Sequence, residues 1–395
     1  MRPTSRLTPF RLVVFLLALF LPAMASADST MPSLVVDVET GRVLHAQREF
    51  ERWHPASITK LMTAWVAFRE VESGALTLKS PVRVSLNAAR KPPSHMAYPV
   101  GTIVTLDNAL KMMLVKSAND IAVAIAESVS GSVEDFADRM NAEAARLGMA
   151  DSHFVNPHGL HDEGQYSSAY DLALLARAIR REFPQYDRYF STEALKDGET
   201  VYDSYNILLG RFAGADGMKT GYICESGFNL VASATRNGHT LIAVVLGEMS
   251  SKGRAERAAE LLELGFARLD MLESLPPLAT LQPPAGHSAE VADMRATVCS
   301  QEANDARWAS RSLDSFATPA LTPLARALVA VPIFKGGAEG ISKSAILFAG
   351  RYFDELPVPA GRPVPLTDEV AELRAQAGFP GGTIPIPQSR PDEGA

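Results

Sequence analysis

Two candidate β-hairpins bracket a long helical stretch, and this arrangement restricts the fold more than any other feature of the sequence. One hairpin turns at Thr40-Gly41, between residues 33–39 and 42–47. The other turns at Asn237-Gly238, between 229–235 and 240–247, and this residue pair suits the positive φ angles of a tight turn. Strands at both ends with helices between them predict an α+β fold, in which an antiparallel sheet packs against helices and a mostly helical subdomain.

Helix start and stop signals divide the interval between the hairpins. Pro55 precedes an apolar helix at 57–70, Ser132 caps a helix that Gly148 closes, and Ser168 starts one that Pro184 stops. Two shorter helical patterns cover 106–115 and 120–129. After the second hairpin, a further helix is expected from Arg254 to about Leu272.

The first residues resemble a secretion signal. Arg2, Arg6 and Arg11 precede the apolar run 12–21, and Ala25-Ser26-Ala27 supplies the small residues of a cleavage site. We expect residues 1–27 to be a signal peptide and the protein to be exported, to the periplasm or the outer face of the cytoplasmic membrane. The net charge is −7, and losing the basic signal would make the chain more acidic, which argues against nucleic-acid binding.

Composition suggests further boundaries. A chain of 395 residues is expected to have more than one domain, with a large one at 28–273. Four prolines in 274–286 indicate a linker. The region 287–379 has no clear role, and the Pro/Gly-rich tail 380–395 is expected to be disordered.

No run after the signal is long and apolar enough to span a bilayer, and the apolar stretch 324–334 is interrupted by Pro332, so no strong membrane anchor is expected. The oligomeric state is left open.

The sequence contains two cysteines, Cys224 and Cys299. Two cysteines are too few for a disulfide scaffold. A Cys224–Cys299 bond is allowed outside the cytoplasm, and two buried free thiols are at least as compatible with the sequence. Cys224 lies close to the candidate catalytic strand, where we expect a buried thiol without a catalytic part.

The first candidate site is Ser57-Ile-Thr-Lys60 at the start of an apolar helix. Residues i and i+3 share a helix face, so Ser57 and Lys60 can form a hydrogen bond. A serine hydroxyl becomes a good nucleophile when a neighbour takes its proton, and a lysine can do so if burial or a nearby positive charge lowers its pKa. The Ser-x-x-Lys pattern is expected about once by chance in a chain of this length, so it needs support from other motifs.

Ser-x-Asn occurs at Ser85, Ser117 and Ser204. Ser117-Ala118-Asn119 lies at a bend between two helical stretches, where its side chains can enter a cleft, and we select it. Ser117 is placed to relay a proton between Lys60 and a leaving amine, and the Asn119 amide to bind a substrate peptide bond.

Lys219-Thr220-Gly221 opens a β-rich stretch before the second hairpin. Lys219 and Thr220 can bind a carboxylate, and Gly221 would let a ligand backbone approach the strand. The backbone N–H groups of Ser57 and Tyr222 are candidates for an oxyanion hole.

In this order the motifs resemble those of the serine-type D-alanyl-D-alanine carboxypeptidases, which are low-molecular-mass penicillin-binding proteins. The resemblance covers roughly residues 32–272 and rests on these segments: Pro55-Ala-Ser-Ile-Thr-Lys-Leu-Met-Thr, Met113-Leu-Val-Lys-Ser-Ala-Asn-Asp, Leu147-Gly-Met, His153-Phe-Val-Asn-Pro-His-Gly-Leu, Asp216-Gly-Met-Lys-Thr-Gly-Tyr and Gly227-Phe-Asn-Leu-Val-Ala-Ser-Ala. It implies the penicillin-binding transpeptidase fold, with 28–273 as the D,D-peptidase domain.

The resemblance also implies a reaction. Ser57 would attack the carbonyl of the penultimate D-Ala of a peptidoglycan stem pentapeptide, with Lys60 as base, and water would hydrolyse the acyl-enzyme. Arg254 matches the arginine that helps hold the terminal carboxylate near Lys219. Penicillin and other β-lactams would acylate the same serine, and no cofactor or metal is implied. The chain departs from some relatives in having Ser204 where they carry arginine, and Tyr222 where many carry His or Phe.

Other activities are compatible with part of the pattern. A D,D-endopeptidase that cuts peptidoglycan cross-links would use the same residues. A β-lactamase would need a deacylating base, and between Asn119 and Lys219 the nearest acid, Glu163, lacks a Glu-x-x-x-Asn context. A non-catalytic wall-binding protein would not need Ser57 and Lys60. His153, His158 and His161 suggest a zinc peptidase, but no His-Glu-x-x-His pattern accompanies them.

Overall fold

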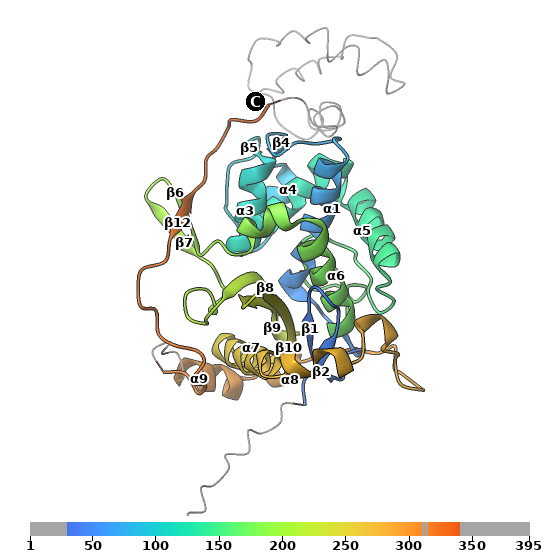
Figure 1. Cartoon of the computed structure of the whole chain (residues 1–395). Helices are drawn as coiled ribbons and strands as arrows, with labels where there is room; N and C mark the ends of the chain where they lie inside the picture. The colour runs from blue at the N-terminus through green and yellow to red at the C-terminus, as the bar shows by residue number, and fades with distance from the viewer. Residues whose placement is uncertain (1–29, 310–311, 313–314, 340–395) are drawn as a thin grey trace, which may run out of the picture. The chain divides into compact units, whose positions relative to one another are not determined.

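The computed structural model describes residues 30–309, 312 and 315–339 (Figure 1). The expected signal peptide at 1–27, the last part of the region 287–379 and the tail at 380–395 lie outside the described residues. Within the described part of the chain, no helix is long and apolar enough to cross a membrane.

A five-stranded antiparallel sheet joins the two predicted hairpins. The first hairpin pairs with the second because β1 lies beside β10, with Val35 opposite Ala243. In spatial order the strands are β2 (Val43–Gln47), β1 (Ser33–Asp37), β10 (His239–Glu248), β9 (Gly227–Arg236) and β8 (Ala215–Ile223). β8, which carries the Lys-Thr-Gly motif, is therefore at one edge of the sheet.

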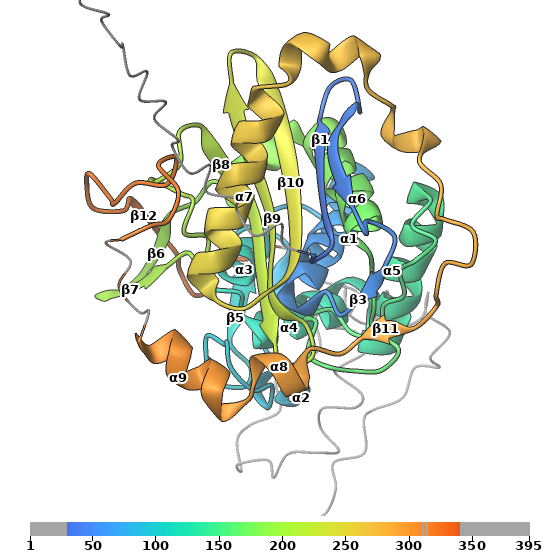
Figure 2. The same ribbon diagram turned by 90° about the horizontal axis from the view of Figure 1, so that it is seen from below.

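Helices cover both faces of the sheet, and the side chains of each strand alternate between them. Val35 packs under α7 (Ser251–Phe266), whereas Leu34 and Val36 belong to the larger core on the other face. α6 (Ala169–Glu182) covers that second face (Figure 1), and Figure 2 shows α7 lying across β9 and β10 from the opposite side. This alternation is the period-two pattern of a sheet buried on both sides.

The larger core continues into a helical subdomain built around α1 and α4. α4 is buried along almost its whole length, including the polar side chains of Asn119, Asp120 and Glu127. The remaining helices are α1 (Lys60–Glu72), α2 (Leu86–Ala89), α3 (Leu106–Val115), α4 (Asn119–Ser130), α5 (Val133–Leu147), α8 (Arg295–Val298) and α9 (Gln301–Ala309); the 3₁₀ turns are η1 (Ala56–Thr59), η2 (Pro184–Tyr189), η3 (Leu269–Ser274) and η4 (Leu278–Thr280).

Most of the local signals in the sequence are confirmed. Asn237 and Gly238 have φ angles of 51° and 82° in the β9–β10 turn, and Gly148 closes α5 at φ 77°. The Ser132 and Ser168 side chains cap α5 and α6 by accepting backbone N–H groups. The expected helix from Arg254 to Leu272 instead begins at Ser251, capped by Ser250, and ends at Phe266, because η3 replaces its last turn.

The chain beyond α7 follows the surface of this unit (Figure 1, yellow to orange). The proline-rich stretch expected as a linker packs beside β2: Val43 N–H donates to the Pro276 carbonyl, and the Leu278 side chain is buried. Farther on, two short strands join small sheets: β11 (Val291–Ala292) pairs with β3 (Arg52–Trp53), and β12 (Ala330–Pro332) pairs with β6 (Ala194–Asp197). β6 also pairs with β7 (Thr200–Asp203). In the helical subdomain, β4 (Pro81–Arg83) pairs with β5 (Ile103–Thr105).

Candidate active site

A cleft of about 310 Å³ lies where the edge strand β8 meets the helical subdomain. All three motifs of the sequence open into it. Its lining residues are Ser57, Pro93, Ser94, Ser117, Asn119, Gly159, Leu160, Tyr205, Thr220, Gly221, Tyr222, Ile223, Phe228, Ser251 and Arg254.

Ser57 and Lys60 come together through a 3₁₀ turn followed by a helix. Ser57 lies in η1, and Lys60 is the first residue of α1. In a 3₁₀ turn residues i and i+3 eclipse one another, so the two side chains point the same way, and Lys60 Nζ lies 2.8 Å from Ser57 Oγ. The predicted contact is present, although its backbone is a tighter helix than expected.

Two fixed acceptors orient the Lys60 amine. Its Nζ lies 2.7 Å from Asn119 Oδ1 and 2.6 Å from the backbone oxygen of His158. A neutral amine has two N–H donors and one lone pair. If those donors bind the two oxygens, the lone pair faces the Ser57 hydroxyl and can accept its proton.

The surroundings of Lys60 favour this neutral form. The side chain is fully buried, and burial lowers its pKa well below the usual value because the charged form loses its hydration. The positive charge of Lys219 lowers the pKa further, whereas the Asp120 carboxylate raises it. Burial and a neighbouring cation were the two conditions that the sequence required for a lysine base.

Ser117 and Asn119 lie at the bend between α3 and α4. Ser117 has a φ of 60°, a left-handed conformation that turns its side chain toward β8, where Lys219 Nζ donates to its Oγ at 3.0 Å. Asn119 Nδ2 donates to the Pro92 carbonyl, and its Oδ1 accepts from Lys60. The amide that was expected to bind substrate therefore makes contacts within the protein at both ends and orients Lys60.

The two alternative Ser-x-Asn matches have structural roles. Ser85 caps α2 by accepting the Ala88 N–H, and Asn87 binds Glu127. Ser204 accepts the Asn206 N–H, and Asn206 donates to the Gly217 carbonyl. Neither serine lines the cleft.

Gly221 is required by the protein itself, which differs from the expected approach of a ligand backbone. A Cβ at this position would lie 2.7 Å from the Pro55 carbonyl oxygen and 3.2 Å from the Ser57 nitrogen. The turn that carries Ser57 thus packs directly on β8. This contact brings the Ser57 and Tyr222 backbones together at the mouth of the cleft.

Two buried cations lie on the β8 side. Burial and the adjacent Arg254 lower the pKa of Lys219 to about 7, and burial lowers the pKa of Arg254 to about 9. A neighbouring carboxylate would shift both pKa values upward. Arg254 donates to the carbonyl oxygens of Gly221 and Asn229 and lines the cleft, so this side of the cleft suits an anionic group.

A loop that was not predicted as part of the site closes the far side of Lys60. The His158 carbonyl contacts Lys60, and Gly159 has a φ of 82° where a Cβ would lie 1.8 Å from the Ala56 carbonyl oxygen. The Asn156-Pro157-His158-Gly159 turn was the available signal. The His158 ring accepts the Leu160 N–H, and burial lowers its pKa to about 3, so the imidazole is neutral.

Asp120 is a second missed residue. Its buried carboxylate accepts the N–H groups of Met96 and Ala97 and holds that loop against the start of α4. The signal was an acidic residue directly after the Ser-x-Asn motif at a helix start.

The structure joins the two cysteines in a disulfide between Cys224 and Cys299, with Cα atoms 5.6 Å apart. The expectation of a buried thiol at Cys224 was therefore wrong. Cys224 directly follows β8 and Cys299 follows α8, and such proximity of residues 75 positions apart depends on tertiary packing. Tyr222, 41% exposed, lies 3.4 Å from Cys299 Sγ through its hydroxyl and stacks on Phe228.

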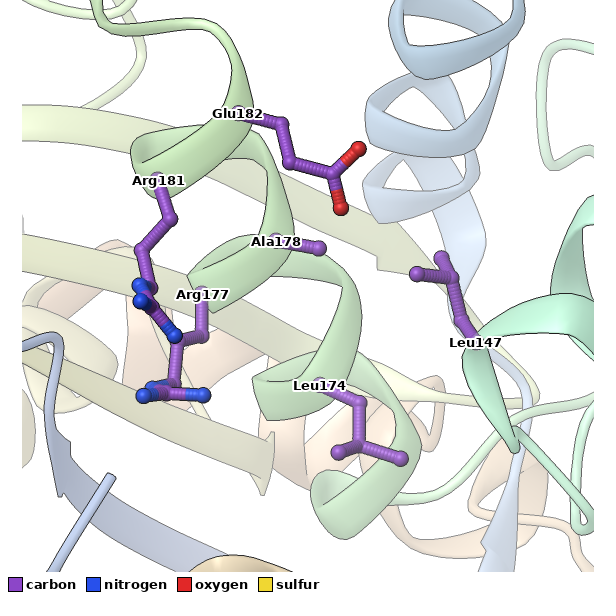
Figure 3. Close-up of a pocket in the computed structure, with 6 residues that line it drawn as sticks. All are labelled: Leu147, Leu174, Arg177, Ala178, Arg181 and Glu182. Carbon is purple, nitrogen blue, oxygen red and sulfur yellow. The ribbon is translucent and has the colours of Figure 1, made fainter. Parts of the chain in front are cut away.

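Another hollow, of about 430 Å³, lies between the end of α5 and α6 (Figure 3). Its polar lining consists of Arg177, Arg181 and Glu182, and Arg177 donates to the Val38 and Glu39 carbonyls. It contains no serine or cysteine nucleophile among its described lining residues. In the described part of the chain, no three His, Cys, Asp or Glu side chains are grouped as metal ligands would be.

Comparison with known proteins agrees with this geometry. The family model for D-alanyl-D-alanine carboxypeptidase (peptidase S11) matches residues 22–250, more than half of the chain. The D-alanyl-D-alanine carboxypeptidase DacD of Salmonella typhimurium is 38% identical over 61% of this chain and 64% of its own length. The chain thus spans somewhat less than two thirds of that relative.

Solved structures show the same fold. Penicillin binding protein 6B from Escherichia coli is 36% identical, with a TM-score of 0.57 over 62% of this chain and 80% of that one. Penicillin-binding protein D2 from Listeria monocytogenes, solved in an ampicillin-bound form, is 28% identical, with a TM-score of 0.53 over 60% of this chain and 97% of that one. The predicted α+β fold of penicillin-binding proteins is confirmed, and the chain belongs to the D-alanyl-D-alanine carboxypeptidase family.

Proposed function

We propose that this protein is a serine D,D-carboxypeptidase that removes the terminal D-Ala from peptidoglycan stem pentapeptides and is inhibited by penicillin. The observation that carries the proposal is that two hydrogen-bonded pairs, Ser57 with Lys60 and Ser117 with Lys219, meet at one cleft and that both lysines are buried. Family membership and the related carboxypeptidases support the substrate class.

Acylation uses the neutral Lys60 amine. Its lone pair takes the Ser57 proton while Oγ bonds to the carbonyl carbon of the penultimate D-Ala. The carbonyl oxygen becomes an oxyanion, which the N–H groups of Ser57 and Tyr222 stabilise. The proton on Lys60 then passes through Ser117 to the amine of the terminal D-Ala as its C–N bond breaks.

Binding of the free carboxylate of the substrate determines where the peptide lies in the cleft. Lys219 and Thr220 on β8 and Arg254 on α7 supply two cations and a hydroxyl, which suits a chain-terminal carboxylate. Such a site places the scissile bond one residue before the terminus. This is the requirement of a carboxypeptidase.

Water completes the reaction by hydrolysing the acyl-enzyme. Among the described residues that line the cleft there is no Asp or Glu, and Glu163 is exposed outside it. The cleft thus lacks a carboxylate base for fast hydrolysis of a penicilloyl ester. This favours long-lived inhibition by penicillin over β-lactamase activity, and the ampicillin-bound form of the Listeria protein supports binding of a β-lactam.

The remaining expectations are also part of the proposal. The protein acts after export, at the periplasmic or outer face of the cytoplasmic membrane, and residues 28–273 form its D,D-peptidase domain. The proline-rich 274–286 then connects this domain to the C-terminal region 287–379. Peptidoglycan stem peptides and β-lactams are its partners, and it needs no cofactor.

The test measures D-Ala released from a muropeptide ending in D-Ala-D-Ala, in wild type and Ser57→Ala. Wild type should release D-Ala and bind fluorescent penicillin covalently, and Ser57→Ala should do neither. Retained release in Ser57→Ala would refute the mechanism. Cleavage of cross-linked muropeptide dimers without D-Ala release would show an endopeptidase instead.

A further inference from the structure

We propose that the segment 293–309, held by the Cys224–Cys299 disulfide, contacts Tyr222 and Phe228 of the substrate cleft and positions Tyr222 against the residue that precedes D-Ala-D-Ala. The inference rests on the proposed function, because it needs a peptide that lies along β8. It assigns a role in substrate selection to a part of the chain after the matched family region, which ends at residue 250.

The direction of the peptide follows from two points on β8. The carboxylate end belongs beside Thr220 and Arg254, and the scissile carbonyl belongs between the N–H groups of Ser57 and Tyr222. An extended peptide through both points runs antiparallel to β8, and its preceding residues lie past Tyr222 toward Ile223 and Cys224. Tyr222 and Ile223 both line the cleft there.

The start of the segment is fixed to the turn after β8 by three links. Met294 N–H donates to the Glu225 carbonyl at 2.8 Å, Arg295 pairs with the Glu225 carboxylate, and Cys299 is bonded to Cys224. The Val298 side chain is fully buried in the larger core. Position 299 is therefore held beside the end of the catalytic strand.

The rest of the segment depends on this anchor. α9 buries none of its described side chains, so burial of apolar side chains does not hold this helix in place. Arg307 on α9 reaches back to the Val298 carbonyl at 2.6 Å, and its guanidinium lies 5.7 Å from the centre of the Phe228 ring. Figure 2 shows α8 and α9 in sequence along this edge of the molecule.

These contacts converge on one aromatic pair. The Tyr222 ring stacks on Phe228 with ring centres 4.2 Å apart, and the Tyr222 hydroxyl meets Cys299 Sγ at 3.4 Å. The guanidinium groups of Arg254 and Arg307 lie 5.6 Å and 5.7 Å from the centre of the Phe228 ring. The disulfide and α9 thus restrict the exposed Tyr222 ring to one orientation at the place where the peptide enters the cleft.

The consequence is a preference for longer peptides. A restrained ring contacts the preceding residue at little entropic cost, whereas a free ring must be ordered by each substrate. A minimal N-acetyl-D-Ala-D-Ala does not extend past Tyr222, and an N-acetylated L-Lys-D-Ala-D-Ala does. Loss of the anchor should therefore weaken cleavage of the tripeptide and spare the dipeptide.

The experiment compares kcat/KM for both peptides in wild type, in Cys224→Ser/Cys299→Ser, and in Arg326→Ala as a matched control. Arg326 lies after the segment 293–309 and ties a later part of the chain to Glu193, away from the cleft. In the double variant we expect about a tenfold loss for the tripeptide, mainly in KM, and less than about a twofold change for the dipeptide. Arg326→Ala should change neither by more than about twofold.

Reversible reduction of the disulfide in the wild type tests the same point without requiring the double variant to fold. A dithiol reduces the disulfide of the folded wild type to two thiols and is itself oxidised, and air oxidation restores the bond. The tripeptide activity should fall and recover, and the dipeptide activity should stay constant. Equal losses for both peptides, or no loss for either, would overturn the inference, whereas a wild type that cleaves neither peptide would refute the proposed function instead.

Discussion

The backbone of Gly221 packs against the Pro55 carbonyl oxygen so closely that a Cβ added to Gly221 would lie 2.7 Å from that oxygen. The catalytic strand and the turn that carries Ser57 are therefore one packed unit. The glycine of the Lys-Thr-Gly motif sets the distance between the nucleophile and the strand along which substrate lies.

Gly221→Ala should separate these two elements. The methyl group would push the η1 turn from β8, because a backbone oxygen cannot rotate away as a side chain can, and overpacking of this kind destabilises by about 1–3 kcal/mol. We expect a lower Tm and a slower acylation by fluorescent penicillin in the fraction that folds. Gly265→Ala is the matched control, because its Cβ would crowd the Leu241 and Val35 side chains under α7. Equal acylation rates in the two variants would contradict this account of Gly221.

Lys60→Ala tests the general base. Removal of the amine leaves Ser57 without a proton acceptor, and a positioned base contributes about 10²–10⁴-fold to such steps. The second-order rate constant for acylation by penicillin should fall by that factor while circular dichroism stays native. Lys79→Ala removes an exposed lysine that pairs with Glu339, and it should acylate like wild type. A loss of less than about tenfold in Lys60→Ala would assign the base elsewhere.

The pH profile should reflect two lysines with opposite requirements. Lys60 must be neutral, so kcat/KM rises with pH through its lowered pKa. Lys219 must be charged to bind the substrate carboxylate, so kcat/KM falls as pH rises through about 7. A substrate with a terminal amide should lack the falling limb, since it has no carboxylate. Persistence of that limb with the amide would exclude Lys219 as its source.

Lys219→Ala supplies the reciprocal test. The Lys219 charge lowers the pKa of Lys60, so its removal should raise that pKa and move the rising limb to higher pH. The position of the limb is the readout, because weaker substrate binding alters only its height. An unshifted limb would mean that the two lysines do not interact electrostatically.

His158→Ala separates the imidazole from the backbone carbonyl. The pKa of the ring is about 3, so at neutral pH the imidazole is neutral and supplies no imidazolium acid, and the carbonyl that contacts Lys60 remains in the variant. Acylation should stay within about fivefold of wild type, and a chelator should have no effect on either protein. A loss comparable to that of Lys60→Ala, or inhibition by the chelator, would revive a histidine- or metal-based reaction.

Much of the fold could be predicted because its signals are local. The Asn237-Gly238 turn, the serine caps of α5 and α6 and the Gly148 stop depend on residues a few positions apart. The exact ends were less predictable: the expected helix to Leu272 ends at Phe266, because packing decides where a helix yields to a 3₁₀ turn.

The sequence alone determined the order of the three motifs and, through their local structure, the strand and helices that carry them. How these elements meet depends on tertiary packing. The His158 carbonyl on Lys60, the Pro55 oxygen against Gly221 and the Cys224–Cys299 bond each join distant parts of the chain. The physical reason is that a turn or cap is encoded by neighbours in sequence, whereas a contact between distant residues depends on how the whole core packs.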